Sequence, residues 1–281
     1  MSLQFLSEWL RCPNCFKPLS PSAALVLSCD SGHAFDVNKR GYVSLLAGPR
    51  KFIGDSAAML DARNRFQSTG WFEPLQASIS QIINAERPQR ILDVGCGTGY
   101  YVRGVLADSS PMSRVLGMDL SPAAVARTVA GNALIDGLVA DVWAPLPVRD
   151  ESADVILNVF APRNAAEFHR TLRPGGLLLV VVPQPSHLQE LRRAGLAVNM
   201  QADKAEHLVS SLSPWFVSER QAALSRRMDL AAADVADLIG MGPSAHHTAV
   251  DDTKGLEGLE REVTAAFDLF SFRRRDVTVT S

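Results

Sequence analysis

The sequence predicts an α/β protein with a parallel, Rossmann-like sheet, preceded by a small domain that a metal ion stabilises. Three observations predict this arrangement. A short apolar strand runs into a glycine-rich turn at 91–99. Further apolar segments follow it, and two of them end in an acidic residue. Three of the four cysteines lie within the first 29 residues. We therefore expect a zinc-binding domain at 1–50 and a larger domain at 51–281.

Length and composition set the first limits. A chain of 281 residues can form one large domain or two domains of about 100 to 200 residues. Its hydrophobic content of 47% is sufficient for a buried core. The sequence contains no apolar run of 18 residues and does not start like a signal sequence, so we expect a soluble, cytoplasmic protein with no membrane partner.

Positive charge is concentrated in the segment 1–53. This segment carries +3, which leaves −5 for the rest of the chain because the whole carries −2. A basic segment on an acidic body suits local contact with phosphates, and ordinary scatter of surface charge is the alternative. The charged residues of the segment are Arg11, Lys17, Lys39, Arg40, Arg50 and Lys51 against Glu8, Asp30 and Asp36.

The cysteines of the first segment have the spacing of a zinc site. Cys12 and Cys15 are separated by two residues, and Cys29 is followed four residues later by His33. Two such turns can supply the four ligands of a tetrahedral zinc ion. Because all four positions would be filled by the protein, the site is expected to be structural and not catalytic. A domain of about 50 residues with few large apolar side chains also needs such a constraint.

The segment between the cysteines and the glycine-rich turn contains several expected elements. Residues 35–46 alternate as two strands around a turn at Gly41, and 47–53 form a basic linker. Asp55 or Ser56 can cap a helix whose apolar residues recur at helical spacing. A second helix, from about Glu73 to Asn84, precedes the first strand of the sheet.

The glycine-rich turn is the strongest signal for ligand binding. Gly95, Gly97 and Gly99 let the backbone turn tightly and let a ligand approach where a side chain would collide. A helix is expected at 100–107. The strand that follows ends in Asp119, 20 residues after Gly99, where a carboxylate could bind ribose hydroxyls. A dinucleotide-binding Rossmann domain uses a similar turn and is the alternative.

Later segments supply the rest of the sheet. A third strand at 137–140 ends in Asp141, where an adenine amine could be read. A fourth strand covers 154–160, and an Arg-Pro-Gly-Gly turn leads into a fifth at 177–182. A helix at 203–215 follows. Antiparallel strands six and seven, expected at 222–230 and 277–280 around a helix at 231–239, would complete a seven-stranded sheet.

This order of elements resembles the class I S-adenosylmethionine (SAM) methyltransferases. Asp93 to Gly99 matches their first motif, Asp119 their ribose-binding acid, and the Arg-Pro-Gly-Gly turn their usual entry to strand five. The dinucleotide-binding alternative does not normally use that turn. The resemblance implies SAM as a cofactor. The residues expected to bind it are Asp93, Gly95, Gly97, Gly99, Asp119, Leu120, Asp141, Val142, Asn158 and Arg63.

A closer resemblance, to the RlmA family of 23S rRNA methyltransferases, covers nearly the whole chain. It rests on the Cys-Pro-x-Cys and Cys-x3-His turns, followed in order by the motifs Gly-Tyr-Val-x-Leu-Leu, Gly-Asp-Ser, Asn-Val-Phe-Ala-Pro-Arg-Asn and Met-Gly-Pro-Ser. The resemblance is greatest to the Gram-positive branch, which includes tylosin-resistance enzymes. It implies methylation of guanine N1 in a domain II hairpin of 23S rRNA near the peptide exit tunnel, a homodimer, and RNA recognition by 1–50.

Three residues are candidates for catalysis at the acceptor base. Asn158 ends the fourth strand and could bind the SAM amino group or the base edge. Phe160 could stack on an extruded base, with core packing as the alternative. His187 follows strand five and could be a general base, a phosphate contact or a helix cap. Arg63 could bind the SAM carboxylate or an rRNA phosphate, or could be an ordinary helix-surface arginine. His246 and His247 could line the pocket or lie in a surface loop.

If the substrate is rRNA, Lys39, Arg40, Arg50 and Lys51 are expected to contact its phosphates. The run 273–275, three arginines, could add phosphate contacts or form a solvated face. Two other functions remain open on the residues alone. The chain could methylate a small molecule and carry the zinc only for stability, or it could bind RNA with an inactive SAM fold. The intact Asp93, Gly95, Gly97 and Asp119 argue against the inactive fold.

Overall fold

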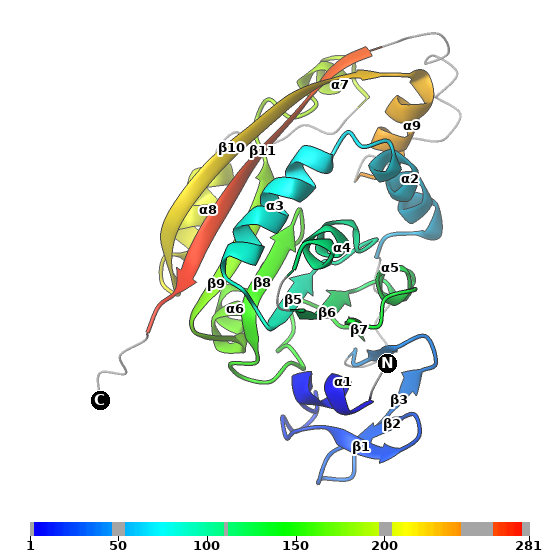
Figure 1. The fold of residues 1–281 in the computed structure, drawn as a ribbon, viewed down its shortest axis with the longest axis vertical. Coiled ribbons are helices and arrows are strands. Elements are labelled where there is room, and N and C mark those ends of the chain that lie inside the picture. The colour runs from blue at the N-terminus through cyan, green and yellow to red at the C-terminus, as the bar shows by residue number, and fades with distance from the viewer. Residues whose placement is uncertain (1–2, 47–53, 110–111, 197–203, 243–260, 277–281) are drawn as a thin grey trace.

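The computed structural model describes residues 3–46, 54–109, 112–196, 204–242 and 261–276 (Figure 1). Its strands form one sheet with the order β1-β2-β3-β4-β7-β6-β5-β8-β9-β11-β10. The strands are β1 (Ser20–Ala23), β2 (Val26–Ser28), β3 (Ala34–Asn38), β4 (Tyr42–Ser44), β5 (Arg90–Val94), β6 (Arg114–Asp119), β7 (Ile135–Val139), β8 (Ala153–Val159), β9 (Leu172–Pro183), β10 (Phe216–Leu230) and β11 (Arg261–Arg274).

The seven strands from β7 to β10 have the class I topology that the sequence predicts. β7, β6, β5, β8 and β9 are parallel, and β11 runs antiparallel between β9 and β10. Because the carboxyl ends of parallel strands meet at one edge, the turns that follow β5, β6, β7 and β8 lie close together. All the predicted cofactor contacts except Arg63 come from these turns or the strand ends before them.

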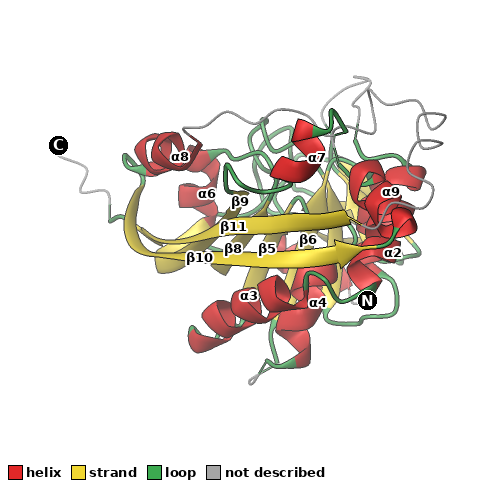
Figure 2. Ribbon diagram, turned by 90° about the horizontal axis from the view of Figure 1, so that it is seen from above, coloured by secondary structure: helices red, strands yellow, loops and turns green. Residues whose placement is uncertain are grey.

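Helices cover both faces of this sheet. α3 (Glu73–Ala85) and α4 (Tyr100–Ala107) lie on one face, whereas α6 (Ala165–Thr171) and α8 (Lys204–Leu212) lie on the other (Figure 2). The remaining helices are α1 (Leu3–Trp9), α2 (Ala57–Ser68), α5 (Pro122–Val129), α7 (Gln189–Arg193) and α9 (Ala232–Gly240). No helix of the described ranges combines the length and the apolar character that a membrane span requires.

The apolar side chains form two cores, one on each face of the sheet, because side chains alternate along each strand. In β9, Leu177, Leu179 and Val181 point to the core under α3 and α4, and Leu178 and Val180 point to the opposite core. Strands buried on both faces show a continuous apolar sequence instead of an alternating one. This explains why 177–182 is apolar throughout.

Three helices begin at the polar side chains expected of helix caps. The hydroxyl of Ser56 accepts a hydrogen bond from the Met59 amide (3.2 Å) at the start of α2, as the sequence predicts. Ser121 and Asn164 cap α5 and α6 in the same way. Each cap satisfies a backbone amide that the helix itself cannot, and so fixes the residue at which the helix begins.

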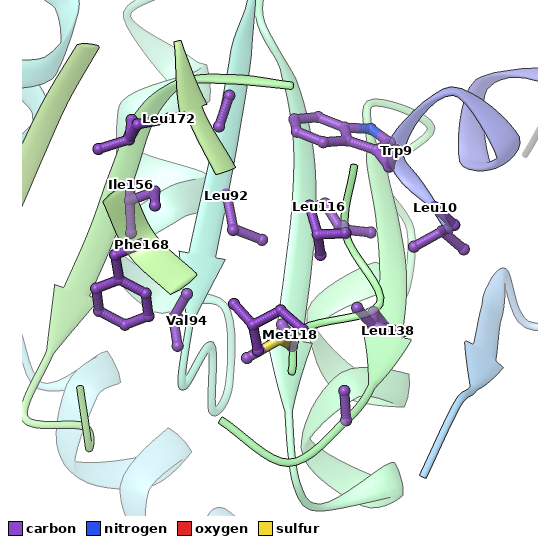
Figure 3. Close-up of a cluster of buried hydrophobic side chains, with 14 of the residues drawn as sticks. Trp9, Leu10, Leu92, Val94, Leu116, Met118, Leu138, Ile156, Phe168 and Leu172 are labelled. Carbon is purple, nitrogen blue, oxygen red and sulfur yellow. The ribbon is translucent and has the colours of Figure 1, made fainter. Parts of the chain in front are cut away.

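The N-terminal segment is joined to the main sheet and does not stand apart from it. β4 pairs with β7 in parallel, with Tyr42 opposite Gly137. Trp9 and Leu10 are buried in the same core as Leu116 and Leu138 (Figure 3). Arg149 donates hydrogen bonds to the carbonyls of residues 10 and 19. The sheet and one apolar core are therefore continuous across the expected boundary at residue 50.

The last two strands differ from the sequence prediction. β10 begins at Phe216, six residues before the expected start. The sheet contains β11 at Arg261–Arg274, which the sequence analysis missed. The strand expected at 277–280 lies outside the described residues. Charged and apolar residues are mixed in β11, so its pattern is weak, and its pairing with β9 and β10 supplies the stabilisation that the local sequence lacks.

Candidate functional site

The glycine-rich turn is shaped by steric exclusion. Gly95, Gly97 and Gly99 all have positive φ, a region that residues with side chains rarely adopt. A Cβ on Gly95 would lie 2.3 Å from the Cβ of Ala161, in the turn after β8. A Cβ on Gly97 would lie 3.1 Å from Nη1 of Arg63. The turns after β5 and β8 and the helix α2 therefore meet at this loop, and only glycine fits there.

Asp119 holds the glycine-rich turn in place. Its Oδ2 accepts a hydrogen bond from the Gly97 amide (3.0 Å), and its Oδ1 accepts one from the Ser121 amide (2.9 Å). Burial raises the pKa of Asp119. A carboxylate can accept about four hydrogen bonds, so both oxygens keep capacity for ribose hydroxyls.

Asp93 is a carboxyl group buried beneath the same turn. It is 4% exposed, and no hydrogen bond from the described residues reaches its side chain. Burial, and then the nearby charge of Asp119, raises the pKa of Asp93 to about 7. A buried acid without a protein partner is available to a cationic ligand, because a positive charge would replace the hydration that burial removed.

Asn158 supplies a second unused group. It is fully buried, and its Nδ2 donates to the carbonyls of Val94 (3.3 Å) and Pro162 (3.0 Å). Its Oδ1 is buried and has no hydrogen-bond partner among the described residues. Buried polar atoms are nearly always hydrogen-bonded, so Oδ1 has capacity for a donor, which a ligand could supply.

Together these groups fit SAM. Its ammonium group can donate to Oδ1 of Asn158 and to the carboxylate of Asp93, and its ribose hydroxyls can donate to Asp119. The glycine-rich turn leaves room for the backbone to approach the ligand. Of the residues predicted from the sequence, Asp93, Asp119 and Asn158 therefore lie at the same edge of the sheet.

Arg63 lies over the turn but is already paired. Its Nη1 donates to Oδ2 of Asp55 (2.5 Å), and its Nη2 donates to the carbonyl of Met241 (2.8 Å). This arrangement joins α2 to the end of α9 above Gly97. In the structure its guanidinium contacts an acid and a carbonyl, so it is not simply a surface arginine.

The turn after β7 forms the opposite wall. Oδ1 of Asp141 accepts a hydrogen bond from the Trp143 amide (3.0 Å), which closes a tight turn. Nδ2 of Asn164 donates to the carbonyl of Val142 (3.0 Å) and so joins this turn to the one after β8. Leu120 and Val142 are half-buried, as expected for residues that line a ligand site.

Phe160 sits in a strained position at the end of β8. Its φ is 53°, which is uncommon for a residue with a bulky side chain and is found most often at functional sites. It is 44% exposed. Its ring centroid lies 5.3 Å from that of Phe267 and 6.4 Å from that of Tyr101. An exposed aromatic ring between two others forms a surface on which a planar base can stack.

Phe267 was not identified from the sequence, because its strand β11 was not predicted. Tyr101 follows the glycine-rich turn and could have been found from that position. The tyrosine lies in helix α4, and burial raises the pKa of its hydroxyl, which therefore stays protonated. Both residues pack against the ring of Phe160.

His187 is neutral and points its Nδ1 inward. Nδ1 accepts a hydrogen bond from the Ala266 amide (3.2 Å), so the ring carries its proton on Nε2. Its ring centroid lies 4.7 Å from that of Phe267. Burial, and then the charge of Arg192, lowers the pKa of His187 to about 4. It does not cap the N-terminus of α7; Leu188 is the residue at that position.

The four predicted zinc ligands form one cluster. Their ligand atoms all lie within 4.8 Å of one another. Nδ1 of His33 lies 3.5 Å from the sulfur of Cys12 and 3.4 Å from that of Cys29, and the sulfurs of Cys15 and Cys29 lie 3.6 Å apart. A tetrahedral zinc ion with ordinary bond lengths separates its ligands by about 3.6–3.8 Å, so the cluster fits Zn²⁺.

The surroundings of Cys15 also favour metal binding. Hydrogen bonds from the Lys17 backbone and from Ser31 lower the pKa of Cys15 to about 6. The thiolate is the form that binds zinc, so this environment favours the ligand state.

The other basic residues singled out from the sequence lie elsewhere. Lys39 and Arg40 are exposed in the turn before β4, at the amino ends of the parallel strands and opposite the edge that carries Phe160. Arg50, Lys51, His246 and His247 lie outside the described residues. Arg273 pairs with Glu86 and Glu219, and Arg274 pairs with Glu151. The run 273–275 is thus occupied by ion pairs and backbone contacts.

Comparisons with known proteins agree with this geometry. A methyltransferase-domain family model matches residues 92–180, and the RlmA N-terminal zinc-ribbon model matches residues 10–51. A crystal structure from Bacillus halodurans, described as a methyltransferase, superposes with a TM-score of 0.50 at 16% identity, and covers 70% of this chain and 97% of that one. The protein is thus a class I SAM-dependent methyltransferase with an N-terminal zinc ribbon.

Its relatives define the family. The 23S rRNA (guanine(748)-N(1))-methyltransferase of Streptomyces fradiae is 38% identical over 87% of this chain and 88% of its own length. A relative from Micromonospora griseorubida, assigned to the same guanine-N(1) activity, is 37% identical over 85% and 87%. The chain belongs to the 23S rRNA (guanine-N(1)-)-methyltransferase family of RlmA type.

Proposed function

We propose that this enzyme transfers a methyl group from SAM to N1 of a guanine in a domain II hairpin of 23S rRNA, near the peptide exit tunnel. The guanine corresponds to position 748, which the name of the Streptomyces fradiae relative gives for that enzyme. Methylation there would confer tylosin-type macrolide resistance. We further propose that residues 1–50 act as the RNA-recognition domain of a cytoplasmic homodimer.

The observation that carries this proposal is the joint presence of two features. The similarity to rRNA methyltransferases extends over both the zinc ribbon and the catalytic domain. The site also presents an exposed aromatic ring, Phe160, next to the groups that fit SAM. A small-molecule methyltransferase would need neither the ribbon nor an open stacking surface.

The residues of the site would act mainly by positioning. SAM supplies an electrophilic methyl group. Asp93 and Asn158 hold the ammonium end of the ligand, and Asp119 holds its ribose. Phe160 and its aromatic neighbours hold the guanine plane, so that N1 meets the methyl group in line.

His187 is better suited to donate a hydrogen bond than to remove a proton. A base with a pKa of about 4 has little affinity for the N1 proton of guanine at neutral pH. Its Nε2–H, in contrast, can stabilise the negative charge that develops on O6 as the N1 proton leaves to solvent. We therefore assign His187 the role of an electrostatic donor.

The function is tested by incubating the protein with tritiated-methyl SAM and deproteinised 23S rRNA. We expect label in the RNA and a reverse-transcription stop at the guanine equivalent to 748. Transcripts in which that guanine is replaced by adenine should accept no label. If label appeared in a small molecule from an extract and not in rRNA, the result would favour methylation of a small molecule as the function.

The role of the basic N-terminal segment is tested separately. Lys39→Ala with Arg40→Ala should weaken rRNA binding and flatten its salt dependence by about one unit per lost phosphate contact. Unchanged binding would show that this turn does not contact the RNA.

A further inference from the structure

Arg163 is a half-buried arginine that the methyl-transfer site described above does not use. It lies in the turn between β8 and α6, three residues after Phe160. Its Nη1 donates one hydrogen bond, to the carbonyl of Ala161 at 3.2 Å. Within the described ranges no carboxylate lies within ion-pair distance of its guanidinium. Arg170 and Arg173, which follow in the chain, both pair with acids.

An arginine in this environment has unused binding capacity. Burial lowers the pKa of Arg163, and no neighbouring acid offsets that effect. The guanidinium nevertheless stays charged and has five N–H donors in a planar fork. A partly buried cation without a counter-charge costs free energy, which a ligand carrying oxygen anions would recover.

The turn that carries Arg163 is fixed at both ends. Nδ2 of Asn158 donates to the carbonyl of Pro162 (3.0 Å). Asn164 accepts the Glu167 amide at the start of α6 and also donates to Val142. Three residues span at most about 10 Å, so Phe160 and Arg163 can reach the base and the backbone of one nucleotide or of adjacent nucleotides.

We propose that Arg163 binds a phosphate of the target guanosine or of its immediate neighbour while Phe160 stacks on the extruded base. The proposal rests on the rRNA-methyltransferase function given above. A flipped nucleotide must be held by its backbone as well as its base. An arginine fork matches two phosphate oxygens, which a lysine cannot do.

The position of Arg163 suits this role better than the basic turn at Lys39 and Arg40. That turn lies at the amino ends of the parallel strands, whereas Arg163 lies at the carboxyl edge with Phe160 and the glycine-rich turn. A phosphate bound by Arg163 therefore belongs to the nucleotide being methylated and not to a distant part of the hairpin.

The test uses the full-length enzyme with Arg163→Gln and Arg163→Lys. SAM affinity is measured by calorimetry, and rRNA affinity by filter binding at several salt concentrations, together with KM and kcat for methylation. Arg227→Gln is the matched control. It also removes one positive charge, but Arg227 is 77% exposed and pairs with Glu262 at 3.1 Å.

Arg163→Gln should leave SAM affinity unchanged, raise KM for rRNA at least roughly tenfold, and reduce the salt slope by about one unit. Arg163→Lys keeps the charge, so it should keep the slope and lose part of the affinity. The Arg227 control should match the wild type.

Three outcomes would overturn the proposal. Lower SAM affinity with unchanged rRNA affinity would show that the guanidinium binds the SAM carboxylate. Wild-type behaviour of Arg163→Gln in both assays would show that Arg163 contacts neither SAM nor rRNA. An equal loss of rRNA affinity in both variants, with a lowered melting temperature, would show a structural role. Failure of the wild type to methylate rRNA would refute the proposed function itself, which separates the two questions.

Discussion

Oδ2 of Asp119, at the end of β6, accepts the amide hydrogen of Gly97, in the turn after β5, at 3.0 Å. The acid that the sequence assigns to the ribose thus also fixes the shape of the glycine-rich turn. Loss of this carboxylate would affect the cofactor site in two ways, by removing ribose contacts and by releasing the turn.

Asp119→Ala should therefore weaken SAM binding by about 1.5–3 kcal/mol or more, the range for a hydrogen bond to a charged group. Isothermal titration calorimetry measures the change. Glu262→Gln, an exposed surface change, is the control and should bind SAM like the wild type. Wild-type affinity in the Asp119 variant would show that this acid does not face the cofactor.

Asp93 should make SAM binding dependent on pH. Its pKa is raised to about 7 in the free protein, and the ionised form is the one that attracts the ammonium of SAM. Affinity should fall as the pH decreases through 7 and below. Calorimetry between pH 5.5 and 8.5 tests this.

Asp93→Asn removes the titrating group, so its SAM affinity should be lower at pH 8 and nearly independent of pH. The same pKa shift implies that the ligand-free protein loses stability as pH rises from about 4 to 7, because the folded state holds a proton that the unfolded state releases. A wild-type SAM affinity that does not change between pH 5.5 and 8.5 would contradict the contact between Asp93 and the SAM ammonium.

Titration of His187 should not change kcat near neutral pH. Because its pKa is lowered to about 4, it stays neutral between pH 6 and 8 and acts through Nε2–H. His187→Gln retains an amide donor and should keep most of kcat, whereas His187→Phe should lower kcat by roughly 10²–10³-fold. If the kcat of the wild type changed with a pKa near 6.5, and this change were absent in both variants, His187 would be identified as a general base.

The zinc ribbon should contain one zinc ion per chain. Cys12→Ser with Cys15→Ser should lose it, as measured by atomic emission spectrometry, because two of the four ligands are gone. The variant should still bind SAM, since Asp93, Asp119 and Asn158 lie on β5, β6 and β8, at least one strand removed from β4. Its melting temperature should fall, because β4 pairs with β7.

Loss of SAM binding in that variant would show that the ribbon supports the catalytic edge directly. Val43→Thr would then be an informative comparison. This residue is fully buried in β4 and pairs with Leu138, so the change disturbs the shared edge without touching the zinc ligands.

The Cys/His cluster, and the common location of the residues expected to bind the cofactor, could be predicted because each depends on short-range spacing. Cys12 and Cys15 can only bind one ion if they lie in one turn, and the ligand atoms indeed lie together. Asp93, Asp119 and Asn158 each follow or end a strand, and parallel strands bring their carboxyl ends to one edge whatever the loops between them do. The helix cap at Ser56 was likewise a local feature.

Other features could not be read from the sequence because they depend on contacts between distant segments. Phe267 reaches Phe160 only because β11 pairs with β9, and the mixed sequence of β11 gave no clear strand pattern. The pairing of β4 with β7, which joins the segment 1–50 to the main sheet, could not be predicted because the two strands lie about 90 residues apart. The sequence analysis expected Arg63 near the cofactor. Its hydrogen bonds to Asp55 and Met241 could not be predicted, because they depend on where α2 and α9 lie.

By itself, the sequence determined the class of fold, the cofactor motif and the zinc ligands, since these are encoded in spacings of a few residues. Only the tertiary structure decided the electrostatic state of the site. The proton on His187, the raised pKa of Asp93 and the absence of an acid beside Arg163 among the described residues all result from burial and from neighbours far along the chain. Burial is a property of the packed molecule, and no local pattern specifies it.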